Sequence, residues 1–115
     1  MRRLIITCNQ WDVVVVPFPF VDVPKAKHRP TLVLSVSDFN QYGLVILTMI
    51  TTVKSIQHTR DYAITDLDAT GLSRPSLIRW KIFTLDSQII KRKIGHLALI
   101  DQTKCQKLLK SIFQL

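Results

Sequence analysis

Apolar residues along the chain fall into short runs separated by polar turns, a spacing typical of a sheet. The first run, residues 12–20, contains four consecutive valines, whose branched side chains crowd a helical turn and fit a strand. A second run, residues 31–36, follows a polar segment at 21–28, so the two runs predict paired strands. Pro17 and Pro19 lack an N–H group. The first strand must therefore bend, bulge or lie at an edge from Pro17 onward.

A third run, residues 44–53, is almost continuously apolar, which predicts a strand near the centre of the sheet. Residues 37–43 between the second and third runs have turn composition. Weaker patterns predict a short strand at 61–64, a helical turn or loop at 66–72 that Gly71 stops, strands over 75–80 and 81–85, a short turn capped by Asp86 and Ser87, and a basic strand or turn at 91–97.

The C-terminal part of the chain carries the one clear helical pattern, over residues 99–113. Five residues share one helical face there: Cys105, Leu108, Leu109, Ile112 and Phe113. Asp101 suits the first turn, where the helix dipole favours a carboxylate. Short strands followed by a helix predict a mainly β fold with helical additions, a small β-barrel with a C-terminal α-helix. At 115 residues, we expect a single domain over 1–115.

The chain is strongly basic, with 16 Lys and Arg against 8 acidic residues, a net charge of +8 and a pI near 9.9. This balance favours a polyanionic partner, nucleic acid or an acidic protein, although basic residues also simply keep a surface soluble. All eight acidic residues are Asp, which excludes a glutamate base. Apolar residues make up 47% and the mean hydropathy is +0.19, so we expect a buried subunit interface as well as a core.

Cysteine and histidine usage indicates neither a cofactor nor a metal site. The three His and two Cys are scattered without ligand spacing. Cys8 and Cys105 follow no disulfide pattern and are expected to be reduced, although a disulfide between them stays open. No apolar run approaches the roughly 20 residues of a membrane span. We expect a cytoplasmic protein.

Cations gather at the end of the first pair of strands. Lys25, Lys27 and His28 occupy the connecting loop, and Arg29 precedes Pro30, a position biased towards extended backbone. Such a cluster at the mouth of a sheet predicts a phosphate-handling site. His28 is the group there that titrates near neutral pH. If His28 and Arg29 are both extended, however, their side chains point to opposite faces.

Four stretches resemble the MazF/PemK family of toxins from type II toxin–antitoxin systems. They read DVVVVPFPF at 12–20, HRPTLVLS at 28–35, LTMIT at 47–51, and PSLIR at 75–79 with TLD at 84–86. In order and approximate spacing they span almost the whole chain beyond residue 10. The resemblance implies an SH3-like barrel (MazF/CcdB-like) that forms a homodimer. It also implies a metal-independent, sequence-selective endoribonuclease that cleaves single-stranded RNA (mRNA) to 2′,3′-cyclic phosphate and 5′-OH ends, under control of a cognate acidic antitoxin.

The family's catalytic pair, an Arg before Pro and a Thr ending the third strand, falls on Arg29 and Thr51. We add His28 as a third candidate. RNA phosphates are expected to meet Lys25, Lys27, Thr52, Lys54 and Arg79, and bases to meet Phe18, Phe20 and Trp11. Trp11 departs from the family, which has Gly before this Asp. The departure puts the local backbone, which glycine accepts more easily in a tight conformation, and the RNA specificity in question, and Trp11 could instead fill an interface or offer a stacking face for a base.

Simpler explanations and other functions stay open at this point. An Arg-Pro pair can mark only the end of a turn, and Thr is common in strands for its β propensity. His58 and His96 are expected to be structural or solvated, and the run 91–93 to be a solvated surface. A DNA gyrase poison has the same fold and needs no Arg29–Thr51 pair. A third possibility is a non-catalytic barrel that binds nucleic acid.

Overall fold

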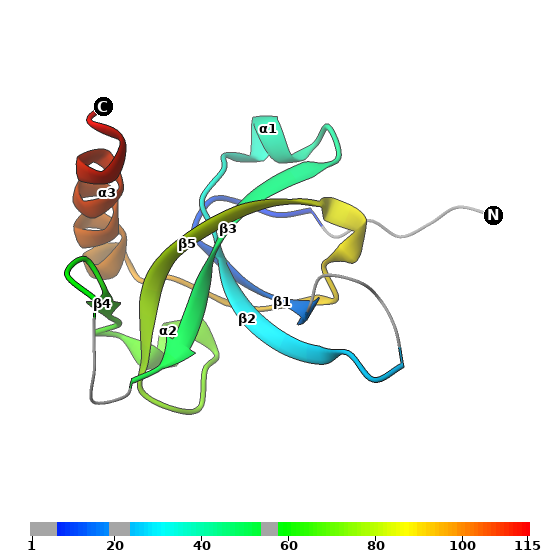
Figure 1. Ribbon diagram of the computed structural model, residues 1–115, viewed down its shortest axis with the longest axis horizontal. Helices are drawn as coiled ribbons and strands as arrows, with labels where there is room; N and C mark the ends of the chain where they lie inside the picture. Colours follow the sequence, from blue (N-terminus) through cyan, green and yellow to red (C-terminus); the bar gives the residue numbers. More distant parts are fainter. Residues whose placement is uncertain (1–6, 19–23, 54–57) are drawn as a thin grey trace.

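The structure, a computed structural model, describes residues 7–18, 24–53 and 58–115. Its strands are β1 (Asp12–Phe18), β2 (Lys27–Val33), β3 (Leu44–Thr52), β4 (Tyr62–Ala63), β5 (Ser76–Asp86) and β6 (Arg92–His96). Its helices are α1 (Ser37–Asn40), α2 (Leu67–Thr70), the 3-10 helix η1 (Ser87–Ile89) and α3 (Leu99–Phe113). The strands pair antiparallel in the order β4-β5-β3-β2-β1-β6, and the sheet curls into a half-barrel with α3 standing beside it (Figure 1). The predicted mainly β fold with a C-terminal helix is confirmed.

The first two strands form the predicted hairpin. β2 starts and ends earlier than predicted, because the chain turns towards α1 after Leu34, whose N–H still donates to the carbonyl of Ile46 at 2.8 Å. β6 pairs with the other side of β1 only as far as Val15. Pro17 therefore lies where β1 has one neighbouring strand, as its missing N–H group predicts.

β3 occupies a central position between β2 and β5, as its continuous apolar run predicted. The two predicted strands over 75–85 are one strand, β5, which is interrupted by a bulge. The turn at 66–72 contains α2, and Gly71 ends this helix with a φ of +76°. A Cβ on Gly71 would lie 2.0 Å from the carbonyl oxygen of Ile94, so only glycine fits there.

Alternation along the strands divides the core between the two faces of the sheet. Val13 and Leu32 belong to one buried cluster, and their neighbours Val14 and Val33 belong to the other. The first cluster includes Cys105 of α3 and the second includes Cys8, so the two thiols lie in separate parts of the core. Cys8 and Cys105 do not form a disulfide, which answers the question left open by the sequence. Burial raises the pKa of Cys8 to about 11 and that of Cys105 to about 12.

Helix α3 has the predicted bounds, but its apolar face is only partly covered within one chain. Cys105 is fully buried, whereas the Phe113 side chain is 54% exposed. At the other end of α3, Asp101 is buried and accepts hydrogen bonds from the Tyr62 hydroxyl and the backbone N–H groups of Thr65 and Asp66. Asp101 thus anchors α3 to the segment that follows β4. In the described part of the chain, no helix is both long and apolar enough to cross a membrane.

A buried carboxylate also joins the start of β1 to β6. Asp12 is fully buried and accepts from the backbone N–H of Asn9 at 2.8 Å. One of its oxygens lies 3.1 Å from Lys93 Nζ and 2.9 Å from His96 Nδ1. His96 is therefore structural, and within the basic run Lys93 holds a buried partner rather than being a purely solvated side chain.

Candidate nucleic-acid site

Arg29 and Thr51 lie opposite each other where two neighbouring strands separate. The ladder between β2 and β3 runs from the pair Val33 and Leu47 to the pair Thr31 and Met49, and ends there. Pro30 is the next residue of β2 in this direction, and it has no N–H group with which to continue the ladder. The same register, continued by two residues, sets Arg29 opposite Thr51, and strand alternation places both on one face of the sheet.

Two cavities adjoin at this point. The Arg74 cavity, of about 220 Å³, is lined by Arg29, Pro30, Ile50, Thr51, Thr52, Leu72, Ser73, Arg74 and Ser76. The Phe18 cavity, of about 450 Å³, is lined by Phe18, Arg29, Met49, Ile50, Thr51, Lys81, Ile82 and Phe83. Arg29, Ile50 and Thr51 are common to both. A guanidinium and a hydroxyl from separate strands therefore form part of the boundary between two hollows.

Arg29 is exposed and rests against an aromatic ring. Its guanidinium carbon lies 5.9 Å from the centroid of Phe18, which comes from the neighbouring strand β1. This is the range of a cation–π contact, which steadies the side chain without neutralising its charge. Among the described residues, the ion pairs of carboxylates involve Arg79, Lys93 and His96 and not Arg29. The planar, charged guanidinium of Arg29, on the same face as the Thr51 hydroxyl, fits the oxygens of a phosphodiester.

Two further cations, which were not predicted from the sequence, line the cavities. Arg74 lines the Arg74 cavity and Lys81 lines the Phe18 cavity, and both are exposed. For Arg74 the signal was present, because Arg74-Pro75 repeats the dipeptide Arg29-Pro30 that marked the first site. The position of Lys81 depends on a bulge, which the apolar pattern of β5 does not reveal.

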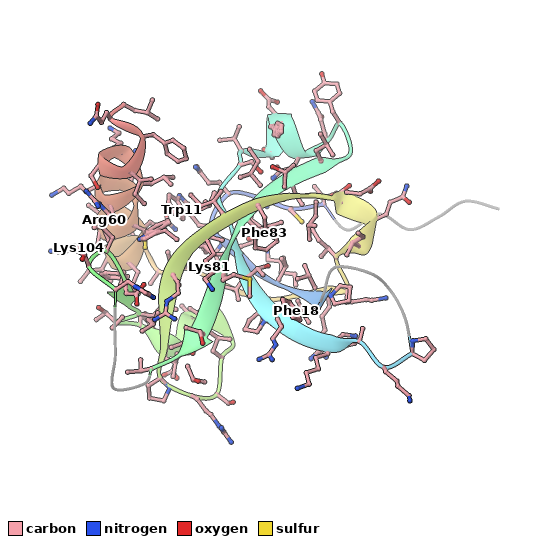
Figure 2. The ribbon with its side chains drawn as sticks, viewed as in Figure 1. Trp11, Phe18, Arg60, Lys81, Phe83 and Lys104 are labelled. Atoms are coloured by element: carbon pink, nitrogen blue, oxygen red, sulfur yellow. The ribbon has the colours of Figure 1, made fainter. Side chains whose placement is uncertain are left out.

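The bulge in β5 lies at Trp80 and Lys81. β5 pairs with β3 through Ile82 opposite Thr48 and resumes with Arg79 opposite Met49, so the two residues between are left out of the ladder. The buried Thr48 hydroxyl donates to the carbonyl of Arg79 at 2.6 Å and thereby fills the interruption. Bulges of this kind turn side chains away from strict alternation. Figure 2 shows Lys81 between Phe83 and Phe18 on one side and Arg60 on the other.

Some predicted residues fall beside the pair and others do not. Thr52 lines the Arg74 cavity, and Phe18 lines the Phe18 cavity. Lys25 and Lys27 are exposed, Lys27 at the start of β2 opposite Phe18. Lys54 and Phe20 lie outside the described residues.

The structure does not bring His28 to the pair. His28 immediately precedes Arg29 within β2, so strand alternation points its side chain to the opposite face. It lines neither the Arg74 cavity nor the Phe18 cavity. Both His28 and Arg29 have an extended backbone, and in that case the sequence already predicted that their side chains point to opposite faces.

Arg79 is held by a carboxylate of its own. Its Nη2 donates to Asp61 at 2.8 Å, and the Asp61 side chain is only 2% exposed. The hydrogen bond from Arg79 is the main reason that the pKa of Asp61 lies below its ordinary value, and it raises the pKa of Arg79. Arg79 thus forms an ion pair that fixes the turn before β4, and its expected role as a phosphate ligand stays a prediction.

Trp11 is part of the core and not a surface for stacking bases. The residue is 8% exposed and packs with Leu97 and Cys105, between the sheet and α3 (Figure 2). Its φ is +74°, in the left-handed region. The backbone here does have the conformation that glycine accepts more easily, and Trp11 adopts it with its N–H bonded to Val33 O at 2.8 Å and its carbonyl to Leu97 N at 2.9 Å.

Among the described residues, no group of three or more His, Cys, Asp or Glu side chains is arranged to hold a metal ion. The candidate site is thus a rim with cations, hydroxyls and aromatic rings, set on a small antiparallel half-barrel. Arg29, Arg74 and Lys81 supply its positive charge. These features define a protein whose site suits a phosphodiester chain.

Comparison with known proteins identifies the family. Residues 9–113 match the model of the PemK-like, MazF-like toxins of type II toxin–antitoxin systems, and the chain belongs to this family. Members of the family are generally endoribonucleases. A search of curated proteins found no match.

Solved structures of the family share the fold at low sequence identity. The chain is similar to the Mycobacterium tuberculosis toxin MazF-mt6, with 19% identity, a TM-score of 0.70, and coverage of 90% of this chain and 97% of that one. It is also similar to a mycobacterial endoribonuclease in complex with its cognate antitoxin, with 17% identity, a TM-score of 0.72, and coverage of 95% of each chain. MazF from Deinococcus radiodurans gives 15% identity, a TM-score of 0.73, and coverage of 96% and 99%.

Proposed function

We propose that the chain is the toxin of a toxin–antitoxin system, an endoribonuclease that cleaves single-stranded RNA at selected sequences without a metal cofactor. The observation that carries the proposal is the position of Arg29 and Thr51. They come from separate strands, yet both line the Arg74 cavity and the Phe18 cavity. A scissile phosphate on this boundary has its two flanking nucleotides directed into the two hollows.

The reaction that fits such a site uses the RNA as its own nucleophile. The 2′-oxygen forms a bond to phosphorus, the bond from phosphorus to the 5′-oxygen breaks, and the products are a 2′,3′-cyclic phosphate and a 5′-OH. A proton leaves the 2′-OH and a proton reaches the departing 5′-oxygen. Negative charge grows on the non-bridging oxygens meanwhile, and donors fixed in advance stabilise it.

The two central residues have complementary roles in this scheme. The Arg29 guanidinium is a planar cation that carries donors only, so it suits the non-bridging oxygens and the departing 5′-oxygen. Thr51 both donates and accepts, so it suits the attacking 2′-OH or a phosphate oxygen. Arg74 lines the Arg74 cavity and Lys81 lines the Phe18 cavity, so the two cations flank the central pair. Both suit the neighbouring phosphates of the RNA.

The partners follow from charge and apolar exposure. A net charge of +8 and the exposed cations of the rim favour an acidic antitoxin segment that covers the site. Leu99, Ile100 and Phe113, near the two ends of α3, are more than half exposed, which supports a homodimer that buries them. Phe113→Asp is expected to shift the molar mass measured by light scattering from dimer to monomer.

The decisive experiment incubates the purified chain with a long unstructured RNA in the presence of EDTA and identifies the new ends. Discrete cuts with cyclic phosphate ends, lost in Arg29→Ala, support the proposal. Intact RNA together with inhibited DNA supercoiling by gyrase would instead support a gyrase poison. RNA that is bound but never cut would support a non-catalytic member of the family.

A further inference from the structure

We propose that a third cavity, beside Trp80, binds the base of a nucleotide that flanks the cleavage point; this inference rests on the proposed endoribonuclease function. The Trp80 cavity, of about 210 Å³, is lined by His58, Arg60, Asp61, Arg79, Trp80 and Lys81. None of these residues except Lys81 lines the Arg74 cavity or the Phe18 cavity. The Trp80 cavity is therefore a separate hollow that the catalytic pair does not use.

Lys81 connects the Trp80 cavity to the cleavage site. Its side chain lines both the Phe18 cavity and the Trp80 cavity, and it is exposed. The bulge in β5 places Trp80 and Lys81 consecutively at this junction. An RNA chain that passes from Thr51 over Lys81 meets Trp80 next, with the ammonium group of Lys81 available to the phosphate in between.

The aromatic wall of the Trp80 cavity is held in place before any ligand binds. The indole N–H of Trp80 donates to the carbonyl of Arg60 at 2.8 Å. Arg60 in turn donates from Nε to the Ser111 hydroxyl on α3 at 3.1 Å. Because the Trp80 side chain is only partly buried, part of the indole ring remains accessible. A base that stacks on it does not have to order the tryptophan first.

The polar wall of the cavity is a guanidinium held in place by a buried carboxylate. Asp61 accepts from Arg79 Nη2 and from the backbone N–H of His58, each at 2.8 Å. The N–H of Asp61 closes the same turn by donating to His58 O at 3.0 Å. Because the Asp61 carboxylate is almost fully buried, the group that this wall presents to a base is the partly exposed Arg79 guanidinium, which donates to acceptors on the base edge.

The test compares two substrates, a dinucleotide that contains only the cleaved phosphate and a longer oligonucleotide cut at the same place. Trp80→Ala is expected to raise KM for the longer substrate by about 5- to 150-fold, the effect of losing one stacked base, and to leave the dinucleotide unaffected. Trp80→Phe keeps an aromatic face and should retain most of the affinity. Arg92→Ala, which removes an exposed cation of β6 outside all three cavities, is the matched control.

The outcomes separate this inference from the proposed function. Equal loss on both substrates, or no loss on the longer one, overturns the base site while cleavage of the dinucleotide still supports the nuclease. A Trp80→Ala variant that resists an acidic antitoxin peptide but keeps its RNA affinity would overturn it in favour of a protein contact. If Trp80→Ala does not fold, His58→Ala removes an exposed wall residue instead, with a smaller rise in KM expected for the longer substrate and none for the dinucleotide.

Discussion

Arg79 donates from Nη2 to the carboxylate of Asp61 at 2.8 Å, and this contact separates the roles of two arginines, one on β5 and one on β2, with β3 between them. Arg79 is committed to a carboxylate that is itself almost fully buried. Arg29 lies against the Phe18 ring and, among the described residues, forms no ion pair with a carboxylate. Of the two, Arg29 is the guanidinium that we expect to meet a phosphate, while Arg79 holds the turn before β4.

Removing the Arg29 guanidinium should abolish most of the cleavage activity. One fixed donor to a developing oxyanion is typically worth about 10²–10³ in rate, so Arg29→Ala should lower kcat by at least this factor. Arg29→Lys keeps the charge but loses the planar fork and should recover only part of the rate. Initial rates on one RNA substrate measure both, with Arg92→Ala as the control for charge alone. A loss of only a few-fold in Arg29→Ala would remove Arg29 from its role.

The hydroxyl of Thr51 is tested by two substitutions of similar size. Thr51→Val preserves the branched shape that suits β3 but removes the group that donates and accepts, so we expect a fall in kcat of about 10²-fold or more. Thr51→Ser keeps the hydroxyl and should stay within about ten-fold of the native rate. Circular dichroism should show both variants folded. Similar rates for the valine and serine variants would show that the hydroxyl is not used.

Cleavage should weaken steeply as salt is added. For single strands the slope of log affinity against log salt is about −0.7 for each neutralised phosphate, so three cations, Arg29, Arg74 and Lys81, predict a slope of about −2 for kcat/KM. Either Arg74→Ala or Lys81→Ala should make this slope shallower by about 0.7. A salt-independent kcat/KM would indicate a ligand other than a polyanion.

Trp11 tests the cost of a left-handed backbone in the core. Trp11→Ala loses a buried indole and should lower the free energy of unfolding by about 3–5 kcal/mol. Trp11→Gly loses the same packing but removes a left-handed strain of about 1–2 kcal/mol, partly offset by the entropy of glycine in the unfolded chain. Urea unfolding should therefore find the glycine variant more stable than the alanine variant. The opposite order would mean that the φ of +74° is not strained.

The pair of Asp61 and Arg79 predicts how stability depends on pH. The pKa of Asp61 is lowered in the folded protein, chiefly by the hydrogen bond from Arg79. The unfolded chain then binds the proton more readily, so the pair stabilises the fold above the ordinary pKa near 3.8 and loses this contribution as pH falls through the lower folded value. Arg79→Gln should lower the urea midpoint at pH 7, and the difference from the native chain should shrink below pH 4. A difference that is the same at both pH values would contradict this account.

Much of the fold was predictable because it depends on local physics. Four adjacent valines favour a strand, a long apolar run takes a central place, and residues 99–113 repeat with the period of a helix. The bounds of β2 were displaced because the turn into α1 is set by contacts with β3. The bulge in β5 was missed because the apolar pattern along this strand runs on without a break.

The site was predictable only at the residues that match a motif of the family. Arg29 and Thr51 came from the family resemblance, and the register of β2 and β3 places them together. The ion pair of Arg79 was not predictable, because its partner Asp61 is brought to it only by a contact made in three dimensions. Trp11 was misjudged for a similar reason, since a tryptophan next to a strand shows no sign in sequence of whether its ring faces water or α3.

The bulge at Trp80 and Lys81 leaves the pairing of β3 and β5 intact on both sides, with Thr48 bridging the interruption. Side chains at these two positions can therefore change without disturbing the sheet that holds Arg29 and Thr51. Under the proposed function, we therefore expect substitutions at residues 80 and 81 to change which RNA sequence is preferred more than how fast it is cleaved.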